Sequence, residues 1–291
     1  MTIRIGSRDS RLAVIQSELM IQGIRAAVPE ADITLVTMKT TGDKILDRTL
    51  EQIGGKGLFV RELDQALREG RVDFTVHSLK DMPMELPPEL PIAALSRRED
   101  PRDVLVLPEG VRELTPGKPI GCASRRRQLQ LKALFPGMET APVRGNVQTR
   151  LAKLDRGEFS ALVLAAAGLK RLGLAHRISR WFSPEELLPA AGQGILAVQT
   201  RLGTDIGCLA LVHDEDAACC ALAERSFVRA LGGGCTSPVA AYAETAGEEL
   251  TLTGLYVSPD ETLTRKGNIT GSRADAEALG RALAEELSHG T

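Results

Sequence analysis

Aromatic residues make up only 3% of this 291-residue chain, and their scarcity limits the partners it can bind. Proteins that hold single-stranded nucleic acid stack the bases on aromatic side chains, and few such side chains are available here. The formal net charge of -2 also provides no overall field that would attract a polyanion or a membrane surface. We therefore expect neither nucleic acid nor a membrane as a partner, and any anion site must be local.

Cysteine and histidine are also too few, and lack the spacings, for a structural framework. The five cysteines contain no C-x-x-C pair, and the four histidines have no metal-ligand spacing. We expect no disulfide scaffold and no metal. No stretch approaches the ~20 continuous apolar residues of a transmembrane helix, and no apolar signal segment follows Met1. These observations favour a cytoplasmic location.

Arginine, by contrast, is abundant. It supplies 27 of the 36 basic residues. Its planar guanidinium group pairs bidentately with carboxylate or phosphate, so this bias suits a protein that recognises anions. A GC-rich genome produces the same bias, and composition alone does not separate the two explanations.

The first hundred residues alternate between strand and helix patterns, which predicts an α/β fold with a mainly parallel sheet covered by helices. Strands are expected at 3–6, 33–40 and 72–77, and Ser10 is expected to cap a helix that runs to about Ala27. The polar, glycine-ended segment before the next helix is typical of a lid loop.

A second alternating unit follows, with strands expected at 119–123, at Val143 and at 160–166, and the strand-like run ILAVQTR is then expected to return the chain to the first unit. Strands at 239–243, 250–257 and 262–269 and an amphipathic helix predict a small α+β unit at the C-terminal end. The expected division is a discontinuous first domain, a second domain inserted into it and a third domain, with the boundaries 1–98 and 194–213, 99–193, and 214–291.

Two basic segments lie where strands are expected to pass into helices. In SRRRQLQL, Ser124 precedes three arginines at a helix start, where the helix dipole disfavours cations unless an anion is present. The alternative for this string is a solvated basic turn. In VRGNVQTR, Arg144, Gly145 and Arg150 occupy a similar junction. Two such junctions in one unit favour a binding site for a small polyanion.

The string GSRDSR places Arg8 and Ser10 at the corresponding junction of the first unit, so both units are expected to face one cleft. Asp81, in HSLKDMP, follows a strand beside Lys80 and near His77. A carboxylate in such a cleft acts as a general acid or base, or stabilises a developing cation. The alternatives are a helix cap or a simple partner for the lysine.

Cys235 differs from the other cysteines because it follows three glycines and precedes TSP. A cysteine on such a loop is accessible for reaction or for covalent attachment. Cys219 and Cys220 lie in the expected helix AACCALAE, Cys208 has an apolar setting and Cys122 occupies a strand end, and these positions indicate structural roles for all four.

Six strings, in order and spacing, resemble the hydroxymethylbilane synthases, also called porphobilinogen deaminases: HSLKDMP, SRRRQLQL, VRGNVQTR, AAGLKRLG, AAGQG and GGGCTSP. The resemblance covers essentially the whole chain. It implies two lobes like those of type II periplasmic binding proteins, and a third domain that bears a cofactor loop. It also implies that four porphobilinogen molecules are joined head to tail with loss of ammonia at each step, and that hydrolysis then releases linear hydroxymethylbilane. A monomer is expected, with the product passed to the next tetrapyrrole enzyme.

The family's functional residues carry over by motif. Cys235 matches the cysteine that is bonded to a dipyrromethane cofactor, and Asp81 matches the aspartate that contacts pyrrole N–H groups and supports loss of ammonia and the cationic azafulvene that follows. The positions that match cofactor-binding residues are Lys80, Asp81, Ser124, Arg126, Arg127, Arg144 and Gly145. The positions that match substrate-binding residues are Arg8, Ser10, Gln16, Lys56 on the lid, Arg150, Arg171 and Gln193. The resemblance further implies that Asp81 acts as a buried carboxylate.

Three positions depart from the family pattern. Arg125 stands where leucine is usual, Gln52 replaces a common lid lysine, and Gly232 stands where an acidic residue is frequent. A non-catalytic solute-binding protein would also pair two α/β lobes around an anion, but it would need a signal segment. The effector-binding part of a regulator would need a preceding DNA-reading helix-turn-helix. Neither alternative accounts for Cys235.

Overall fold

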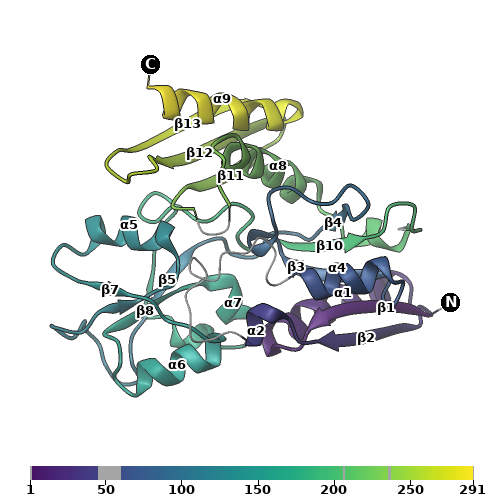
Figure 1. Ribbon diagram of the computed structural model, residues 1–291, viewed down its shortest axis with the longest axis horizontal. Helices are drawn as coiled ribbons and strands as arrows, with labels where there is room; N and C mark the ends of the chain where they lie inside the picture. Colours follow the sequence, from purple (N-terminus) through teal and green to yellow (C-terminus); the bar gives the residue numbers. More distant parts are fainter. Residues whose placement is uncertain (1, 45–59, 206, 235–236, 291) are drawn as a thin grey trace.

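The computed structural model describes residues 2–44, 60–205, 207–234 and 237–290, and its strands form three sheets (Figure 1). The first sheet, in the order β2-β1-β3-β10-β4, contains β1 (Ile3–Arg8), β2 (Ile33–Met38), β3 (Phe74–Ser78), β4 (Ile92–Leu95) and β10 (Leu196–Thr200). The second, in the order β7-β6-β8-β5-β9, contains β5 (Asp103–Val106), β6 (Ile120–Gly121), β7 (Thr140–Ala141), β8 (Ala161–Ala165) and β9 (Arg180–Trp181). The third, in the order β11-β12-β13, contains β11 (Ala240–Ala246), β12 (Glu249–Val257) and β13 (Thr264–Ser272).

The helices follow the same grouping along the chain. The α-helices are α1 (Arg11–Ala27), α2 (Thr41–Lys44) and α4 (Arg61–Arg68) in the first unit, α5 (Arg125–Leu134), α6 (Val147–Asp155) and α7 (Ala166–Arg171) in the second, and α8 (Glu215–Ala230) and α9 (Ala276–His289) in the third. Short 3₁₀ helices are η1 (Leu79–Asp81), η2 (Ala175–Arg177), η3 (Gly207–Leu211) and η4 (Arg273–Asp275). Within the described ranges, no helix is long and apolar enough to cross a membrane.

The expected α/β class, with a small α+β unit at the C-terminal end, is confirmed. β1 pairs in parallel with β2 and β3, and β6 pairs in parallel with β7 and β8. β10 runs antiparallel between β3 and β4, so the chain does return to the first sheet after the second unit. The exact domain boundaries remain a prediction.

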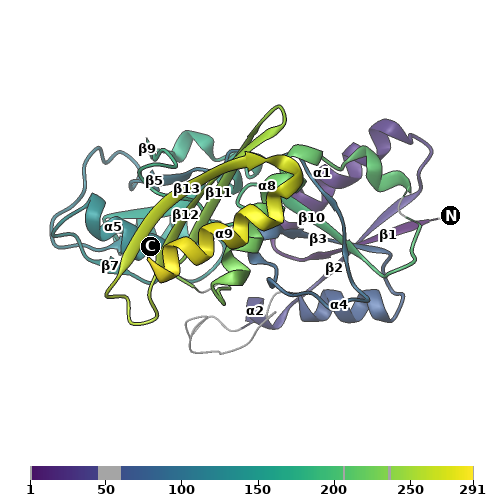
Figure 2. The ribbon, with the colours of Figure 1, turned by 90° about the horizontal axis from the view of Figure 1, so that it is seen from above.

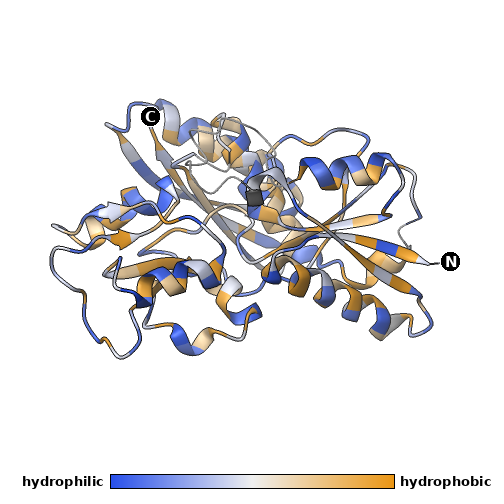
Figure 3. Ribbon diagram, turned by 60° about the horizontal axis from the view of Figure 1, so that its bottom comes forward, coloured by the Kyte–Doolittle hydropathy of each residue, from blue (hydrophilic) through white to orange (hydrophobic). Residues whose placement is uncertain are grey.

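Local sequence accounts for most of these elements. Ser10 has extended backbone dihedrals and accepts a hydrogen bond from the Ala13 N–H at 3.4 Å, so it caps α1 as expected. One face of α1 buries Met20 and Ile24 against Phe74 of β3. Figure 3 shows apolar residues gathered on the strands and on the helix faces that cover them. The strand expected at Val143 lies instead at β7, two residues earlier, where only two residues pair.

The third unit lies over the first two units, which form the two lobes (Figures 1 and 2). Helices α8 and α9 pack on one face of its sheet around Phe227 and Leu283. The other face contacts the second unit, where Leu188 packs with Leu255 and Val257. Alternating side chains of β12 therefore serve two separate cores, as the period of a strand requires.

Two chain segments connect the lobes, a first one at residues 98–99 and a second one at residues 192–194. They run side by side and are held by one buried carboxylate of α8. The Glu99 N–H donates to the Gly194 carbonyl at 3.1 Å, and a Cβ at Gly194, where φ is +93°, would lie 2.1 Å from the Glu99 oxygen. Glu224 is fully buried and pairs with Arg98 of the first segment at 2.7 Å. Its other oxygen accepts from the Gly192 N–H of the second segment at 2.6 Å. The third unit thus anchors both inter-lobe connections at one point.

Replacing Arg98 by alanine is expected to lower the free energy of unfolding by about 3–5 kcal/mol, because Glu224 would then be a buried charge without its counterion. Urea denaturation measures this change. The control is Arg68→Ala, which removes the exposed pair with Glu89 and is expected to cost less than about 1 kcal/mol. Equal losses in the two variants would contradict the anchoring role of Arg98.

Candidate active site

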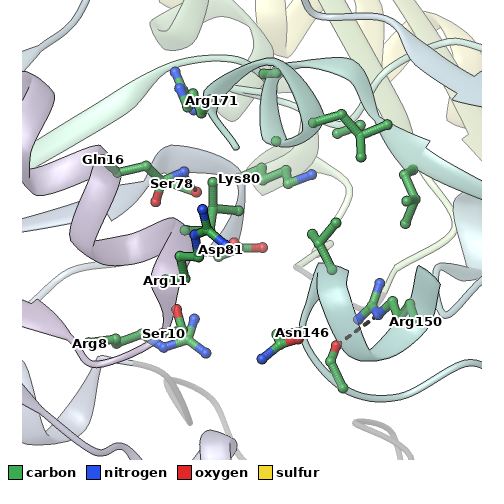
Figure 4. A pocket seen from close by; sticks show the side chains of 18 of the residues that line it. Arg8, Ser10, Arg11, Gln16, Ser78, Lys80, Asp81, Asn146, Arg150 and Arg171 are labelled. Carbon is green, nitrogen blue, oxygen red and sulfur yellow. Dashed lines mark hydrogen bonds between the residues drawn. The ribbon is translucent and has the colours of Figure 1, made fainter. Parts of the chain in front are cut away.

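A pocket of about 680 Å³ lies where the two lobes face each other. Because β1 and β3 are parallel, their carboxyl ends meet at one edge of the first sheet, and this edge forms one wall. The starts of α6 and α7 form the opposite wall. Figure 4 shows Arg8, Ser10 and Gln16 on one side, Asn146 and Arg150 on the other, and Asp81 between them.

The wall from the first lobe is held rigidly by its own polar contacts. Ser10 lies just after β1, and its hydroxyl oxygen caps α1 while its O–H remains able to donate. Gln16 is buried nearly two turns further along α1, and its Nε2 donates to Ser78 Oγ at 2.9 Å. Arg8 ends β1 and also lines the pocket. The expected grouping of these side chains at one strand edge is therefore observed.

Positive charge dominates the pocket. Its lining contains eight basic residues, namely Arg8, Arg11, Lys39, Lys80, Arg127, Arg144, Arg150 and Arg171, and two acidic ones, Asp9 and Asp81. Burial, together with the charges of Arg127 and Arg144, lowers the pKa of Arg150 to about 10, and burial lowers that of Arg171 to about 10. These shifts show that the folded protein holds like charges close together and removes water from them, which costs free energy. A bound polyanion would relieve that cost.

Asp81 ends η1, which directly follows β3. Its side chain is exposed to the pocket, so the expectation of a buried carboxylate is wrong for the structure as described. Across the described residues, no hydrogen bond or ion pair engages the Asp81 carboxylate. Both of its oxygens are therefore available to accept N–H groups or to oppose a positive charge on a ligand.

Lys80 is partly buried next to Asp81 and donates to Gln193 Oε1 at 3.2 Å. Burial and the nearby Arg127 lower the pKa of Lys80 to about 8, against the opposing charges of Asp81 and Asp103. Its ammonium group is thus close to its titration point at neutral pH. Such perturbed groups cluster at functional sites.

The three arginines at the start of α5 have separate roles. Arg126 and Arg127 are buried, and both pair with the fully buried Asp103, at 2.8 and 2.7 Å. Arg127 also lines the pocket, whereas Arg126 lies behind the lining and donates to the Leu188 carbonyl at 2.6 Å. From the sequence, an anionic ligand was expected to offset the charge of these arginines. In the structure, Asp103 supplies much of that negative charge. Burial opposes ionisation of Asp103, but Arg126 and Arg127 outweigh it and hold its pKa well below the usual range.

The second wall is built from the junction before α6. Gly145 adopts a φ of +109°, and a Cβ there would lie 2.8 Å from the Thr149 side chain, so glycine suits this position. Arg150 Nε donates to the Gly145 carbonyl at 2.8 Å, which fixes its guanidinium group over the loop. Arg171, at the end of α7, donates to the Gly194 carbonyl at 2.6 Å. Main-chain acceptors thus orient both arginines into the pocket.

The pocket brings most of the predicted site residues together, but not all of them. Lining it are Arg8, Ser10, Gln16, Lys80, Asp81, Arg127, Arg144, Gly145, Arg150 and Arg171. Ser124, Arg126 and Gln193 are not part of that lining, although Gln193 contacts Lys80 from behind. Cys235, Lys56 and Gln52 lie outside the described residues. The roles of all these residues remain predictions.

Two departures from the family pattern have a structural counterpart. Arg125 does not line the pocket, and its Nε donates to Glu261 in the turn before β13 at 2.6 Å. It therefore ties α5 to the third unit. Gly232 follows α8 with a φ of +63°, as expected for a glycine just past a helix end.

The sequence reasoning missed several residues of the site. Arg11 is the first residue of α1 and lines the pocket, so its position next to Ser10 was a usable signal. Ser78 sits within HSLKDMP and was equally accessible to that reasoning. Asp103 was not, because DVLVLP reads as an ordinary buried strand.

Comparisons with known proteins agree over nearly the whole chain. The model of the porphobilinogen deaminase dipyrromethane cofactor binding domain matches residues 3–206, and that of the porphobilinogen deaminase C-terminal domain matches residues 218–289. The porphobilinogen deaminase of Ruminiclostridium josui is 59% identical, with 98% of this chain and 97% of the relative covered. That of Chromobacterium violaceum is 49% identical, with 98% and 94% covered.

Solved structures show a more distant likeness. The methionine binding protein MetQ aligns with a TM-score of 0.46 and 12% identity, covering 72% of this chain and 88% of that chain. The BenM effector binding domain aligns with a TM-score of 0.42 and 18% identity, covering 72% and 88%.

Proposed function

The chain belongs to the porphobilinogen deaminase family, and on that premise we propose that Asp81 and the cations around it in the inter-lobe pocket perform the family's reaction. The chain is a transferase, a hydroxymethylbilane synthase. It condenses four porphobilinogen molecules head to tail on a dipyrromethane primer, with release of ammonia at each step, and hydrolyses the product to linear hydroxymethylbilane.

One observation carries the assignment of Asp81. It offers a carboxylate without a protein partner, among the described residues, in a pocket that is otherwise strongly cationic. Loss of ammonia from porphobilinogen leaves positive charge on the substrate, and the surrounding arginines would repel that charge. Asp81 opposes it directly and accepts pyrrole N–H groups.

The pocket also fits the dipyrromethane cofactor that the family carries. When bound, this group supplies the terminal pyrrole ring to which the first porphobilinogen is joined. Its acidic side chains need cations, and Lys80, Arg127 and Arg144 supply them from both lobes. At Gly145 the backbone has no side chain to keep a ligand away. We propose that these residues hold the cofactor, and that Cys235 anchors it.

The remaining cations are assigned to the substrate. Each porphobilinogen brings two carboxylates, so a growing chain needs guanidinium groups on both walls of the pocket. Arg8 from the first lobe, and Arg150 and Arg171 from the second, supply them. Guanidinium forks bind carboxylates bidentately, and the main-chain hydrogen bonds of Arg150 and Arg171 reduce the entropy lost on binding.

Replacing Arg150 by leucine is expected to raise the KM for porphobilinogen by about 10- to 100-fold, because a charge-assisted hydrogen bond contributes about 1.5–3 kcal/mol. The measurement is steady-state formation of hydroxymethylbilane, with ammonia release followed in parallel. Arg156→Leu, just past the end of the same helix, removes an exposed partner of Glu158 and is expected to leave KM within about twofold. An unchanged KM in Arg150→Leu would count against its role.

We further propose a monomer that acts in the cytoplasm and passes its product to the next tetrapyrrole enzyme. The four cysteines among the described residues are free thiols, which suits a reducing compartment. Sedimentation velocity tests the first part, and a dimer at micromolar concentration would contradict it.

A further inference from the structure

We propose that Asp103 is a positioning residue for the reaction, which holds Arg127 and, through Gln193, the ammonium group of Lys80 beside Asp81. This inference rests on the function proposed above for the pocket. Asp103 does not line the pocket, so it acts only through these neighbours.

Asp103 is the centre of a buried polar cluster. It is the first residue of β5, and its exposed fraction is 0%. Its carboxylate pairs with Arg126 at 2.8 Å and with Arg127 at 2.7 Å, and it accepts from Gln193 Nε2 at 2.9 Å. The three partners come from α5 and from the second inter-lobe segment. One carboxylate therefore orients groups from two parts of the fold.

Gln193 transmits this order to Lys80. Its Nε2 donates both to Asp103 and to the Pro101 carbonyl, at 2.9 and 2.7 Å. Because both acceptors face the amide nitrogen, the amide oxygen must point the other way, where it accepts from Lys80 Nζ at 3.2 Å. Gln193 is itself 1% exposed, so its side chain has little freedom to turn.

Asp103 also balances the charge around Lys80. The charged groups that face Lys80 are Arg126 and Arg127 of α5, Asp81 of η1 and Asp103 of β5. The two arginines and burial favour the neutral amine, while the two carboxylates favour the ammonium form. Removing the charge of Asp103 leaves Asp81 alone against both arginines. The pKa of Lys80, which is about 8, would then fall.

The first test is Asp103→Asn, which keeps the shape and removes the charge. Lys80 should lose its proton at lower pH, so the alkaline limb of the kcat profile is expected to move down by about one pH unit. Competitive acetylation with acetic anhydride and peptide mass spectrometry measure the titration of Lys80 without relying on activity. The same downward shift is expected there, with labelling of the exposed Lys39 as the internal standard.

The second test is Gln193→Met, which breaks the bridge but leaves the ion cluster intact. It tests the positioning role of Asp103 even if Asp103→Asn does not fold. We expect kcat to fall by about 10- to 100-fold, because a misplacement of about 1 Å at a reacting centre has that effect. The control is Asp100→Asn, three residues before Asp103, which removes a partner of Arg102 outside this cluster and should leave kcat and the pH profile unchanged.

The outcomes separate this inference from the proposed function. If Lys80→Met keeps the wild-type kcat, the role proposed for Lys80 in the pocket is wrong. If Lys80→Met is inactive, but Asp103→Asn and Gln193→Met both retain the wild-type kcat and Lys80 titration, the positioning role of Asp103 is overturned and the function stands. A downward shift in both the pH profile and the acetylation profile of Asp103→Asn supports the inference.

Discussion

Replacing Asp81 by alanine is expected to lower kcat by about 10²- to 10⁴-fold while the protein remains folded. The loss follows from its position, since Asp81 is the carboxylate at the centre of a pocket with eight basic lining residues. Without it, the positive charge that forms when ammonia leaves would face eight basic lining residues, with Asp9 as the one acidic side chain left in the described lining. Stability should change by no more than about 0.5 kcal/mol, because the side chain is exposed and makes no hydrogen bond or ion pair among the described residues.

Steady-state turnover and thermal unfolding, measured on the same preparation, test this prediction. Asp9→Ala provides a matched control, because it removes the other acidic side chain of the lining and changes the net charge equally. Its kcat should stay within about tenfold of wild type. If both variants lose activity to the same extent, net charge rather than the position of Asp81 is responsible. If Asp81→Ala turns over like the wild type, its assigned role is wrong.

The second large effect concerns the covalent anchor. Intact wild-type protein should weigh more than its polypeptide by two pyrrole units, and Cys235→Ser should lose both this added mass and its activity. Cys235 lies outside the described residues, but the other cysteines are poor nucleophiles for physical reasons. Burial raises the pKa of Cys122 to about 11 and that of Cys220 to about 12, so their thiolates are scarce at neutral pH.

Intact-mass spectrometry is the measurement, and Cys219→Ser is the control. Cys219 is partly buried on α8, and its Sγ donates to the Arg273 carbonyl, so its loss should leave the added mass in place. An active wild-type protein without added mass would refute the anchor. Retention of the added mass in Cys235→Ser would move the attachment to another residue.

Much of the fold was predictable because its signals are local. The helix from Ser10 to about Ala27 needed only a capping residue and an apolar period, and α1 ends where expected. The return of the chain at ILAVQTR followed from a single apolar run, and β10 lies in the first sheet. The strand at Val143 was misplaced because a pairing of only two residues leaves almost no pattern.

The predictions for the site were likewise correct where the sequence signals are local. Asp81, Arg144 and Arg150 lie at ends of strands or starts of helices, where sequence patterns are readable, and all three line the pocket. The triplet at the start of α5 looked like one anion site, yet its arginines point to different partners. Arg125 pairs with Glu261 of the third unit, and Arg126 and Arg127 pair with Asp103. These partners are distant in the chain, so no local pattern links them.

The sequence by itself determined the family, the order of strands and helices and most of the charged residues that face the pocket, because short motifs and periodic burial encode these features. Only the tertiary structure decided how the charges are balanced. A buried arginine needs a specific partner at about 3 Å, and Asp103 and Glu224 become such partners only after segments far apart in the chain have packed together. That packing decides which cations face the pocket and which of them also have a counterion in the protein.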